Sequence, residues 1–363
     1  MLKKTVILLS IVAIIVIFFI GIYLYQFYKS NVVRNIKNYN DINILFITKN
    51  NSNEENTNFK LFVIKYNLSD KYTKVFFIDE NITILQRKIK SRTLNEMILS
   101  VQEDKRIDFI KTEIEKLLDN KIKINYYVST DIKNITNIIK LLSKENDTKN
   151  NLILLDNYLK EDKDRIKELY SSIKVINYIK TNINFFNYIN FIKGLKSSII
   201  VLKTNFSLTD IFFLYKYLKE DKEIRYADIP IINKRKRIET DEDNKDKVIN
   251  FLNNNNKQDN KLKLQIFNAT NKNRLALKAA NKLRANKFDV IEWKGYNHKY
   301  DFTIIFDLVD NYEQMKEIKK VLNCGEIIFV PNKLLLTDTM VFLGQDCKIY
   351  DKLDRYEDDN EEE

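Results

Sequence analysis

The sequence has few of the residues that most often build catalytic and metal sites: its 363 residues include 1 histidine and 2 cysteines. His298 lies in a polar stretch, so we expect neither a histidine-dependent catalytic triad nor a multi-histidine metal site. Cys324 and Cys347 lack the spacing of metal ligands. We interpret them as two buried thiols, with a disulfide as the alternative outside the cytoplasm.

Glycine and proline are also scarce, at 5 and 2 residues, whereas lysine, asparagine, isoleucine, tyrosine and phenylalanine are abundant. This composition is typical of a protein from an AT-rich genome. A hydrophobic content of 44% with 12% aromatic residues indicates that most of the chain folds. The length allows two compact domains and a tail.

The net charge is +11, yet no nucleic-acid partner is predicted. Most of the cations are lysines interleaved with Asn, Asp and Glu, which is typical of a solvated surface, and no nucleic-acid-binding module is recognisable. The sharpest basic cluster, residues 234–237, is followed at once by acidic residues between 239 and 243. We interpret residues 233–260 as a linker between domains.

An apolar run over residues 5–25 predicts a membrane-spanning helix. At about 1.5 Å per residue such a run covers roughly 31 Å, the thickness of a bilayer core. Its aromatic exit, residues 23–28, differs from a cleavage site, so an uncleaved anchor is predicted. The flanking charges do not fix the orientation. Because such anchors usually leave a short leader in the cytoplasm, we expect a single-pass protein of the cytoplasmic membrane, extracytoplasmic after the anchor.

Residues 261–348 show the pattern of a small α/β domain. Apolar runs predict strands over residues 262–267, 288–293, 302–306, 327–330 and 340–343. Helices are predicted near residues 312–322 and where Leu275, Ala276, Ala279, Ala280 and Leu283 recur on one face. We interpret this as a β-α-β-β-α-β order, with two helices packed on one sheet.

This segment resembles the C-terminal domain attached to many LytR-CpsA-Psr proteins, a family of bacterial envelope proteins. The residues that match are Asn268, Thr270, Leu275, Ala276, Leu283, Phe288, Val290 and the closing Leu343, Gly344, Gln345 and Asp346. Two glycines of the family pattern are replaced, by Ala269 and Lys287. A non-glycine residue in the left-handed conformation costs only about 1–2 kcal/mol, so the replacements weaken the turns without abolishing the pattern.

Residues 38–232 alternate between strands and helices. Strands are predicted over residues 42–47, 59–66, 74–78, 125–128, 151–155 and 199–202. Helices are predicted over residues 94–102, 108–118, 131–142, 161–171, 186–193 and 208–218. Such alternation predicts a mixed sheet with helices on both faces.

The order of these elements resembles the catalytic domain of the LytR-CpsA-Psr family. The resemblance lies in residues 42–50, 59–84, 124–142 and 204–218. It implies a domain that transfers lipid-linked glycopolymers to peptidoglycan, holding the lipid pyrophosphate with arginines and a magnesium ion with aspartates. Pyrophosphate needs planar, permanently charged donors, and its transfer needs a cation on the developing charge.

The functional residues of the family do not carry over to this chain. Asp79-Glu80-Asn81 stands where the family has a Ser-Ile-Pro-Arg-Asp-like motif, and residues 49–51 and 58–59 supply no aspartate. The late arginine cluster corresponds to residues 176–191, whose only cation is Lys180. We therefore assign no catalytic, cofactor-binding or metal-binding residue, and expect magnesium only if the chain is an enzyme.

Four charged residues lie close together in the sequence and are candidates for a replacement site: Asp79, Glu80, Arg87 and Arg92. Ordinary surface charge is the favoured interpretation. The predicted layout is a leader and anchor (1–28), a degenerate LytR-CpsA-Psr-like domain (38–232), the linker (233–260), a LytR C-terminal domain (261–348) and a solvated acidic tail (349–363).

The favoured hypothesis is a non-catalytic binding or scaffolding protein of the cell envelope. Its expected partners are the membrane together with peptidoglycan, envelope polymers or other envelope proteins. The alternative is a diverged phosphotransferase that attaches lipid-linked glycopolymers to peptidoglycan. A membrane-tethered nucleic-acid regulator would need the opposite orientation and is disfavoured.

Overall fold

The computed structural model describes most of the chain that follows the expected membrane anchor. The described residues are 25, 28–39, 41–51, 57–67, 72–84, 92–142, 164–182, 192–194, 201–207, 209–211, 213–214, 223–234, 237–240, 242–253, 262–331 and 336–349. Outside them lie the acidic tail, the anchor apart from Tyr25, the strand expected at 151–155 and most of the helices expected at 186–193 and 208–218. No helix among the described residues combines the length and the apolar composition that a membrane crossing requires.

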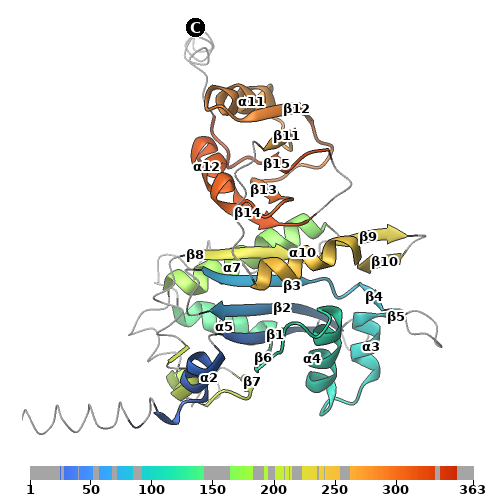
Figure 1. Cartoon of the computed structure of the whole chain (residues 1–363), viewed down its shortest axis with the longest axis vertical. Helices are drawn as coiled ribbons and strands as arrows, with labels where there is room; N and C mark the ends of the chain where they lie inside the picture. The colour runs from blue at the N-terminus through green and yellow to red at the C-terminus, as the bar shows by residue number, and fades with distance from the viewer. Residues whose placement is uncertain are drawn as a thin grey trace, which may run out of the picture.

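One mixed β-sheet of 11 strands runs through the molecule (Figure 1). Its strand order is β12-β11-β15-β13-β14-β8-β3-β2-β1-β6-β7. The strands are β1 (Asp41–Asn51), β2 (Thr57–Asn67), β3 (Tyr72–Ile78), β6 (Tyr126–Asp131), β7 (Lys203–Thr204), β8 (Glu223–Asp228), β11 (Lys263–Asn268), β12 (Asp289–Gly295), β13 (Ile304–Asp307), β14 (Glu326–Phe329) and β15 (Thr339–Leu343). The mixed sheet predicted from the sequence is thus present.

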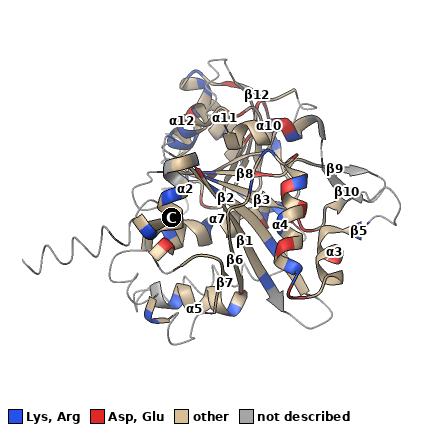
Figure 2. Cartoon of the chain, turned by 60° about the horizontal axis from the view of Figure 1, so that its bottom comes forward, with Lys and Arg blue, Asp and Glu red and all other residues tan. Residues whose placement is uncertain are grey.

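Helices cover both faces of this sheet because apolar side chains alternate along its strands. In β1, Leu45 and Ile47 face one side, where helices α3, α4 and α10 pack, whereas Ile44 and Phe46 face the side covered by α2 and α7. The helices are α2 (Asn31–Tyr39), α3 (Leu94–Ser100), α4 (Arg106–Leu117), α5 (Ile132–Leu142), α7 (Arg165–Asn182), α10 (Glu242–Asn253), α11 (Leu275–Ala285) and α12 (Tyr312–Leu322). Cations and acids alternate along α4 (Figure 2), as expected for a solvated surface of mixed charge.

The C-terminal part follows the predicted order of elements closely. Helices α11 and α12 pack on one face of β11, β13, β14 and β15 through a single apolar core. The alanines and leucines predicted to share one face of α11 are all buried. The strands are mostly parallel, and β15 is antiparallel to β13.

The two parts of the chain share this sheet. Strand β8 pairs in parallel with β3 on one side and with β14 on the other, where Ile328 lies opposite Tyr226 and Phe329 opposite Ala227. Figure 1 shows β14 lying directly against β8. Strand β8 was not predicted from the sequence, so the continuity of the sheet was not foreseen either.

The charged segment expected to be a linker contains regular structure. Strands β9 (Ile231–Lys234) and β10 (Arg237–Thr240) form a hairpin, and α10 follows. The apolar end of α10 is buried in the core of the central sheet, where Phe251 stacks on Phe329 with ring centroids 5.0 Å apart. Residues 254–260 lie outside the described part of the chain.

The two cysteines are paired, which corrects the interpretation of two buried thiols. Cys324, just after α12, forms a disulfide with Cys347, just after β15, with a Cα–Cα distance of 5.3 Å. The bond ties the end of a helix to the closing strand of the C-terminal part.

Candidate functional site

Two strands end in carboxylates at one edge of the sheet. Asp79 directly follows β3, and Asp228 is the last residue of β8. Because these strands are parallel and Phe77 lies opposite Asp228, both ends meet at the same edge. Phe77 packs on the face covered by α7, so alternation places Asp79 and Asp228 on that face too. Both carboxylates are buried.

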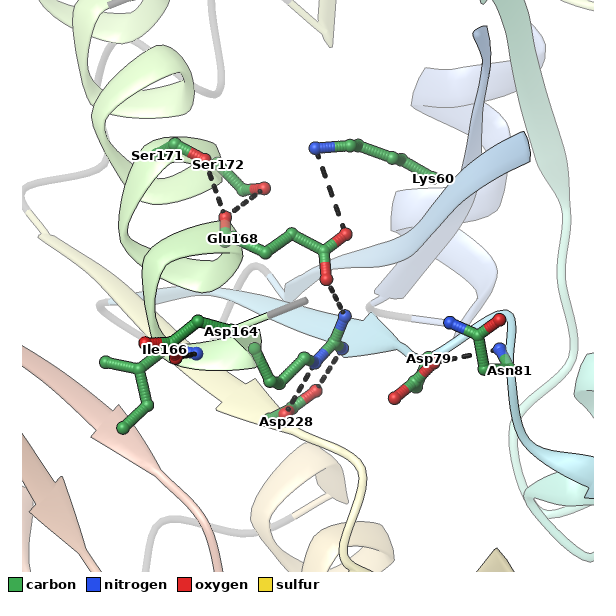
Figure 3. A network of polar contacts seen from close by, with 10 residues as sticks. Lys60, Asp79, Asn81, Asp164, Ile166, Glu168, Ser171, Ser172 and Asp228 are labelled. Atoms are coloured by element: carbon green, nitrogen blue, oxygen red, sulfur yellow. Dashed lines mark hydrogen bonds and ion pairs between the residues drawn. The ribbon is translucent and has the colours of Figure 1, made fainter. Parts of the chain in front are cut away.

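Helix α7 brings Arg165 to Asp228. Figure 3 shows Asp228 and Asp79 below Glu168 of the same helix. Nε of Arg165 donates to Oδ2 of Asp228 at 3.1 Å, and its Nη2 donates to Oδ1 at 2.6 Å. Its Nη1 donates to Oε2 of Glu168, one turn further along the helix, at 2.7 Å. Such bidentate, charge-assisted contacts are among the stronger hydrogen bonds in proteins.

Two further charged residues complete the group. Lys60 on β2 would lie opposite Asp79 if the β2–β3 register continued by one pair, and its Nζ is 3.8 Å from Oε1 of Glu168. Glu80 follows Asp79 and is buried. We call these residues the Arg165 cluster: Lys60, Asp79, Glu80, Arg165, Glu168 and Asp228.

The pKa of Glu80 is strongly perturbed. Burial raises its pKa from 4.5 to about 8, and the carboxylates of Glu168 and Asp79 add to the rise while Arg165 opposes it. One oxygen of Glu80, Oε2, has no hydrogen-bond partner. Near neutral pH its carboxyl group is therefore mainly protonated.

Arg165 keeps its charge in this setting. Burial lowers its pKa, but the carboxylates of Asp228 and Glu168 outweigh that effect and raise it above the ordinary value. With Glu80 neutral, the formal charges of the cluster are two positive and three negative. The site is therefore acidic on balance.

The arrangement limits what the cluster can do chemically. Of the five N–H donors of a guanidinium group, three on Arg165 are already bound to Asp228 and Glu168. An incoming anion could reach these three donors only by displacing the carboxylates, although the Arg165 side chain is 21% exposed. Within the described ranges no three His, Cys, Asp or Glu residues are grouped so as to hold a metal ion.

The structure describes three of the four charged candidates found in the sequence. Asp79 and Glu80 belong to the Arg165 cluster and are buried, so their interpretation as surface charge is wrong. Arg92 lies exposed in the short strand β5 (Arg92–Thr93), which pairs with β4 (Thr83–Ile84). Arg87 lies outside the described residues.

Three other positions compared with the family are described by the structure and lie outside the cluster: Asn58, Phe59 and Lys180. Asn58 accepts a hydrogen bond from Nδ2 of Asn95 at 3.0 Å, and Phe59 is buried in the apolar core. Lys180 lies fifteen residues after Arg165 on α7, which corresponds to about 22 Å along a helix.

Four members of the cluster were missed from the sequence: Lys60, Arg165, Glu168 and Asp228. A carboxylate at the end of a short strand was the available signal for Asp228, but the strand itself was not predicted. Arg165 and Glu168 fall in a predicted helix with the one-turn spacing of an ion pair, which on its own indicates only surface charge.

The sequence motif at the start of the C-terminal part forms a turn after β11. Oδ1 of Asn268 accepts hydrogen bonds from the backbone N–H of Thr270 at 3.0 Å and from its hydroxyl at 2.7 Å. The other turn of the motif follows α11, where Lys287 replaces a family glycine. Its φ of 68° shows that the backbone there adopts the left-handed conformation. Ala269, which replaces the other glycine, is fully buried.

The closing motif packs against the start of β13. Gly344 has no room for a side chain, because a Cβ atom there would overlap the backbone of Phe302. Its N–H donates to the Thr303 hydroxyl at 2.9 Å, and that hydroxyl donates to Oδ1 of Asp346 at 2.7 Å. Glycine and aspartate in this motif therefore have direct structural roles.

Comparison with known proteins identifies the C-terminal part. Residues 261–346 match the family model described as LytR cell envelope-related transcriptional attenuator, which confirms the predicted LytR C-terminal domain. No curated protein matches the chain in sequence.

Several solved structures are partly similar to the chain. A Streptococcus agalactiae protein is 14% identical with a TM-score of 0.49, over 62% of this chain and 90% of that one. TagV of Bacillus subtilis is 14% identical with a TM-score of 0.45, over 58% and 95%. YwtF (TagT), described as a LytR-CPS2A-psr family protein with bound octaprenyl pyrophosphate lipid, is 12% identical with a TM-score of 0.42, over 59% and 89%. What the comparisons identify in this chain is a LytR C-terminal domain over residues 261–346.

Proposed function

We propose that this chain is a membrane-anchored, extracytoplasmic protein of the cell envelope whose central domain is a non-catalytic member of the LytR-CpsA-Psr group. The anchor is the apolar run at residues 5–25. The central domain and the LytR C-terminal domain act together in binding or scaffolding envelope components. The disulfide between Cys324 and Cys347 supports the extracytoplasmic placement, since such bonds persist in oxidising compartments.

The observation that carries this proposal is the state of Arg165. A site that grips pyrophosphate presents guanidinium donors to the ligand, whereas Arg165 is bound to Asp228 and Glu168. The cluster also holds more carboxylates than cations, so it repels a polyanion unless a cation intervenes. These features favour a central domain that does not bind a lipid pyrophosphate.

A specific observation also favours the alternative, a diverged glycopolymer phosphotransferase. The Arg165 cluster includes Asp79 and Glu80, at the position that the sequence resemblance assigns to the family's Ser-Ile-Pro-Arg-Asp-like motif. Polar groups at the ends of parallel strands are a common place for a ligand site in α/β proteins. Under this alternative Lys60 and Arg165 would bind the phosphates, with magnesium supplied alongside the carboxylates.

Binding measurements on the full chain in nonionic detergent separate these two functions. We expect no binding of polyprenyl pyrophosphate at micromolar concentration with magnesium present, and no hydrolysis. Magnesium-dependent binding that is lost on Lys60→Gln, but kept in the control Lys282→Gln on the exposed face of α11, would establish the phosphotransferase alternative instead.

A further inference from the structure

Helix α7 lies against both parts of the shared sheet. Leu169 and Ile173 pack with Phe77 of β3 and with Ile328 of β14, so one apolar face of α7 spans the junction between β8 and β14. The first turn of the same helix carries Arg165 and Glu168 of the Arg165 cluster. A displacement of the C-terminal domain would therefore reach the cluster through α7.

A residue of the LytR C-terminal domain binds the cap of the first turn of α7. Asp164 directly precedes the helix, and its Oδ1 accepts a hydrogen bond from the N–H of Ile166 at 3.0 Å, as a helix-capping residue does. Its other oxygen, Oδ2, accepts a hydrogen bond from the hydroxyl of Tyr300 at 2.8 Å. The next residue is Arg165, so the cap, the domain contact and the cluster are adjacent.

Two more contacts hold the helix at successive turns. Tyr170 stacks on Phe302, with ring centroids 3.7 Å apart and planes inclined by 6°. Nζ of Lys174 donates to Oε1 of Glu326 at 2.9 Å. The interaction between α7 and the C-terminal domain is therefore continuous over three turns.

Tyr300 is itself fixed by the two sequence motifs of the LytR C-terminal domain. Its N–H donates to the carbonyl oxygen of Ala269, in the turn that follows β11, at 2.8 Å. Its carbonyl oxygen accepts from the N–H of Gln345, in the closing motif, at 3.0 Å. The ring is 2% exposed. Both motifs thus converge on Tyr300, whose hydroxyl reaches the cap of α7.

We propose that Tyr300 is a positioning residue for the Arg165 cluster: through its hydrogen bond to Asp164, the LytR C-terminal domain fixes the first turn of α7 and so keeps water away from Glu80. This gives the two turns around Tyr300 a role in the central domain. It applies whether the cluster binds a ligand or only holds the fold together.

The protonation of Glu80 reports on this coupling, because burial is the largest cause of its perturbation. The groups that face it are Asp79 after β3, and Arg165 and Glu168 on α7, with Lys60 and Asp228 completing the cluster. Substitution of Glu80 by glutamine removes its titration. The free energy of unfolding is therefore measured against pH for Glu80→Gln and for the parent, and the difference between the two isolates the contribution of Glu80 ionisation. The pH at which this difference stops rising gives the pKa of Glu80 in the folded state.

The test repeats this comparison in a Tyr300→Phe background, with the full chain in nonionic detergent and urea unfolding followed by circular dichroism. We expect this difference in stability to reach its plateau at a pH lower by at least about half a unit, because a loosened first turn admits water to Glu80. Tyr312→Phe is the matched control: its hydroxyl also makes a contact between the domains, but the acceptor is Oε1 of Glu223 on β8, at 3.0 Å. In that background the plateau should stay where it is.

An unchanged plateau in Tyr300→Phe, or an equal shift in Tyr312→Phe, would overturn the proposal. If Tyr300→Phe does not fold, Asp164→Asn decides instead, because asparagine can still cap the helix but offers Tyr300 a neutral acceptor. The same downward shift is then expected, and its absence would refute the positioning role.

Discussion

Glu80→Gln should make the protein more stable at alkaline pH. Glu80 titrates near 4.5 when exposed and at about 8 in the folded protein. Below pH 4.5 both states are protonated and no penalty exists. Between pH 4.5 and 8 the unfolded chain ionises while the folded chain stays protonated, so the free energy of unfolding falls as pH rises. Above pH 8 both states ionise and the penalty is constant.

The loss of stability follows from the difference between the pKa values of Glu80 in the unfolded and folded states. Each unit of pKa difference corresponds to about 1.4 kcal/mol, which sets an upper limit of about 5 kcal/mol for the full penalty. Glutamine has nearly the same shape and no titration, so Glu80→Gln should gain several kcal/mol over the parent at pH 8.5 and almost nothing at pH 4.5.

Urea unfolding across pH 4.5 to 9 provides the measurement. Asp307 and Asp310, whose pKa values burial raises to about 7 and about 6, also titrate in this range, but they cancel when variant and parent are compared at each pH. Glu317→Gln, at an exposed site on α12, serves as the control for replacing a carboxyl group by an amide away from the cluster. A difference for Glu80→Gln that is flat across this range would refute the assignment of a buried, protonated carboxyl group.

Further substitutions test the C-terminal domain and the topology. Gly344→Ala should lower the free energy of unfolding by at least about 3 kcal/mol, since no side chain fits there, and a normal thermal midpoint would contradict this. Lys287→Gly should raise stability by about 1 kcal/mol by relieving a left-handed backbone, whereas an unchanged urea midpoint would argue against strain. Cys324→Ser with Cys347→Ser should cost about 3 kcal/mol, and mass spectrometry of the unreduced parent should find no free thiol. Protease added to intact spheroplasts should degrade everything beyond residues 5–25; full protection would reverse the proposed orientation.

The C-terminal domain was predicted well because its signals are local. Ala276, Ala279, Ala280 and Leu283 recur at helical spacing and are buried as a set. The disulfide was not predictable in the same way, since the spacing of two cysteines does not show whether the fold brings them together.

The central domain was predicted less completely because several of its elements depend on distant partners. Strand β8 contains Arg225 and Asp228, whose buried charges contradict the usual apolar pattern of a central strand. The guanidinium of Arg225 lies over the ring of Tyr312, 4.5 Å from its centroid, and Asp228 is paired with Arg165. No window of sequence around β8 contains these partners.

The Arg165 cluster was missed for the same reason. Asp79 and Arg165 are far apart in the chain and meet only because β3 pairs with β8 beneath α7. Long-range pairing of opposite charges leaves no periodic signal, so buried acids were interpreted as surface residues.

The continuous sheet fixes the distance between α2 and the far edge of the LytR C-terminal domain. Helix α2, which follows the proposed anchor, packs beside β1, whereas β12 forms the far edge of the LytR C-terminal domain at the other end of the molecule (Figure 1). The strand order places β12 eight strand spacings from β1, and at about 4.8 Å each this is roughly 38 Å. A hydrogen-bonded sheet cannot vary this span as a flexible tether would. A partner bound at β12 would therefore be held at a fixed distance from α2, the helix that follows the proposed anchor.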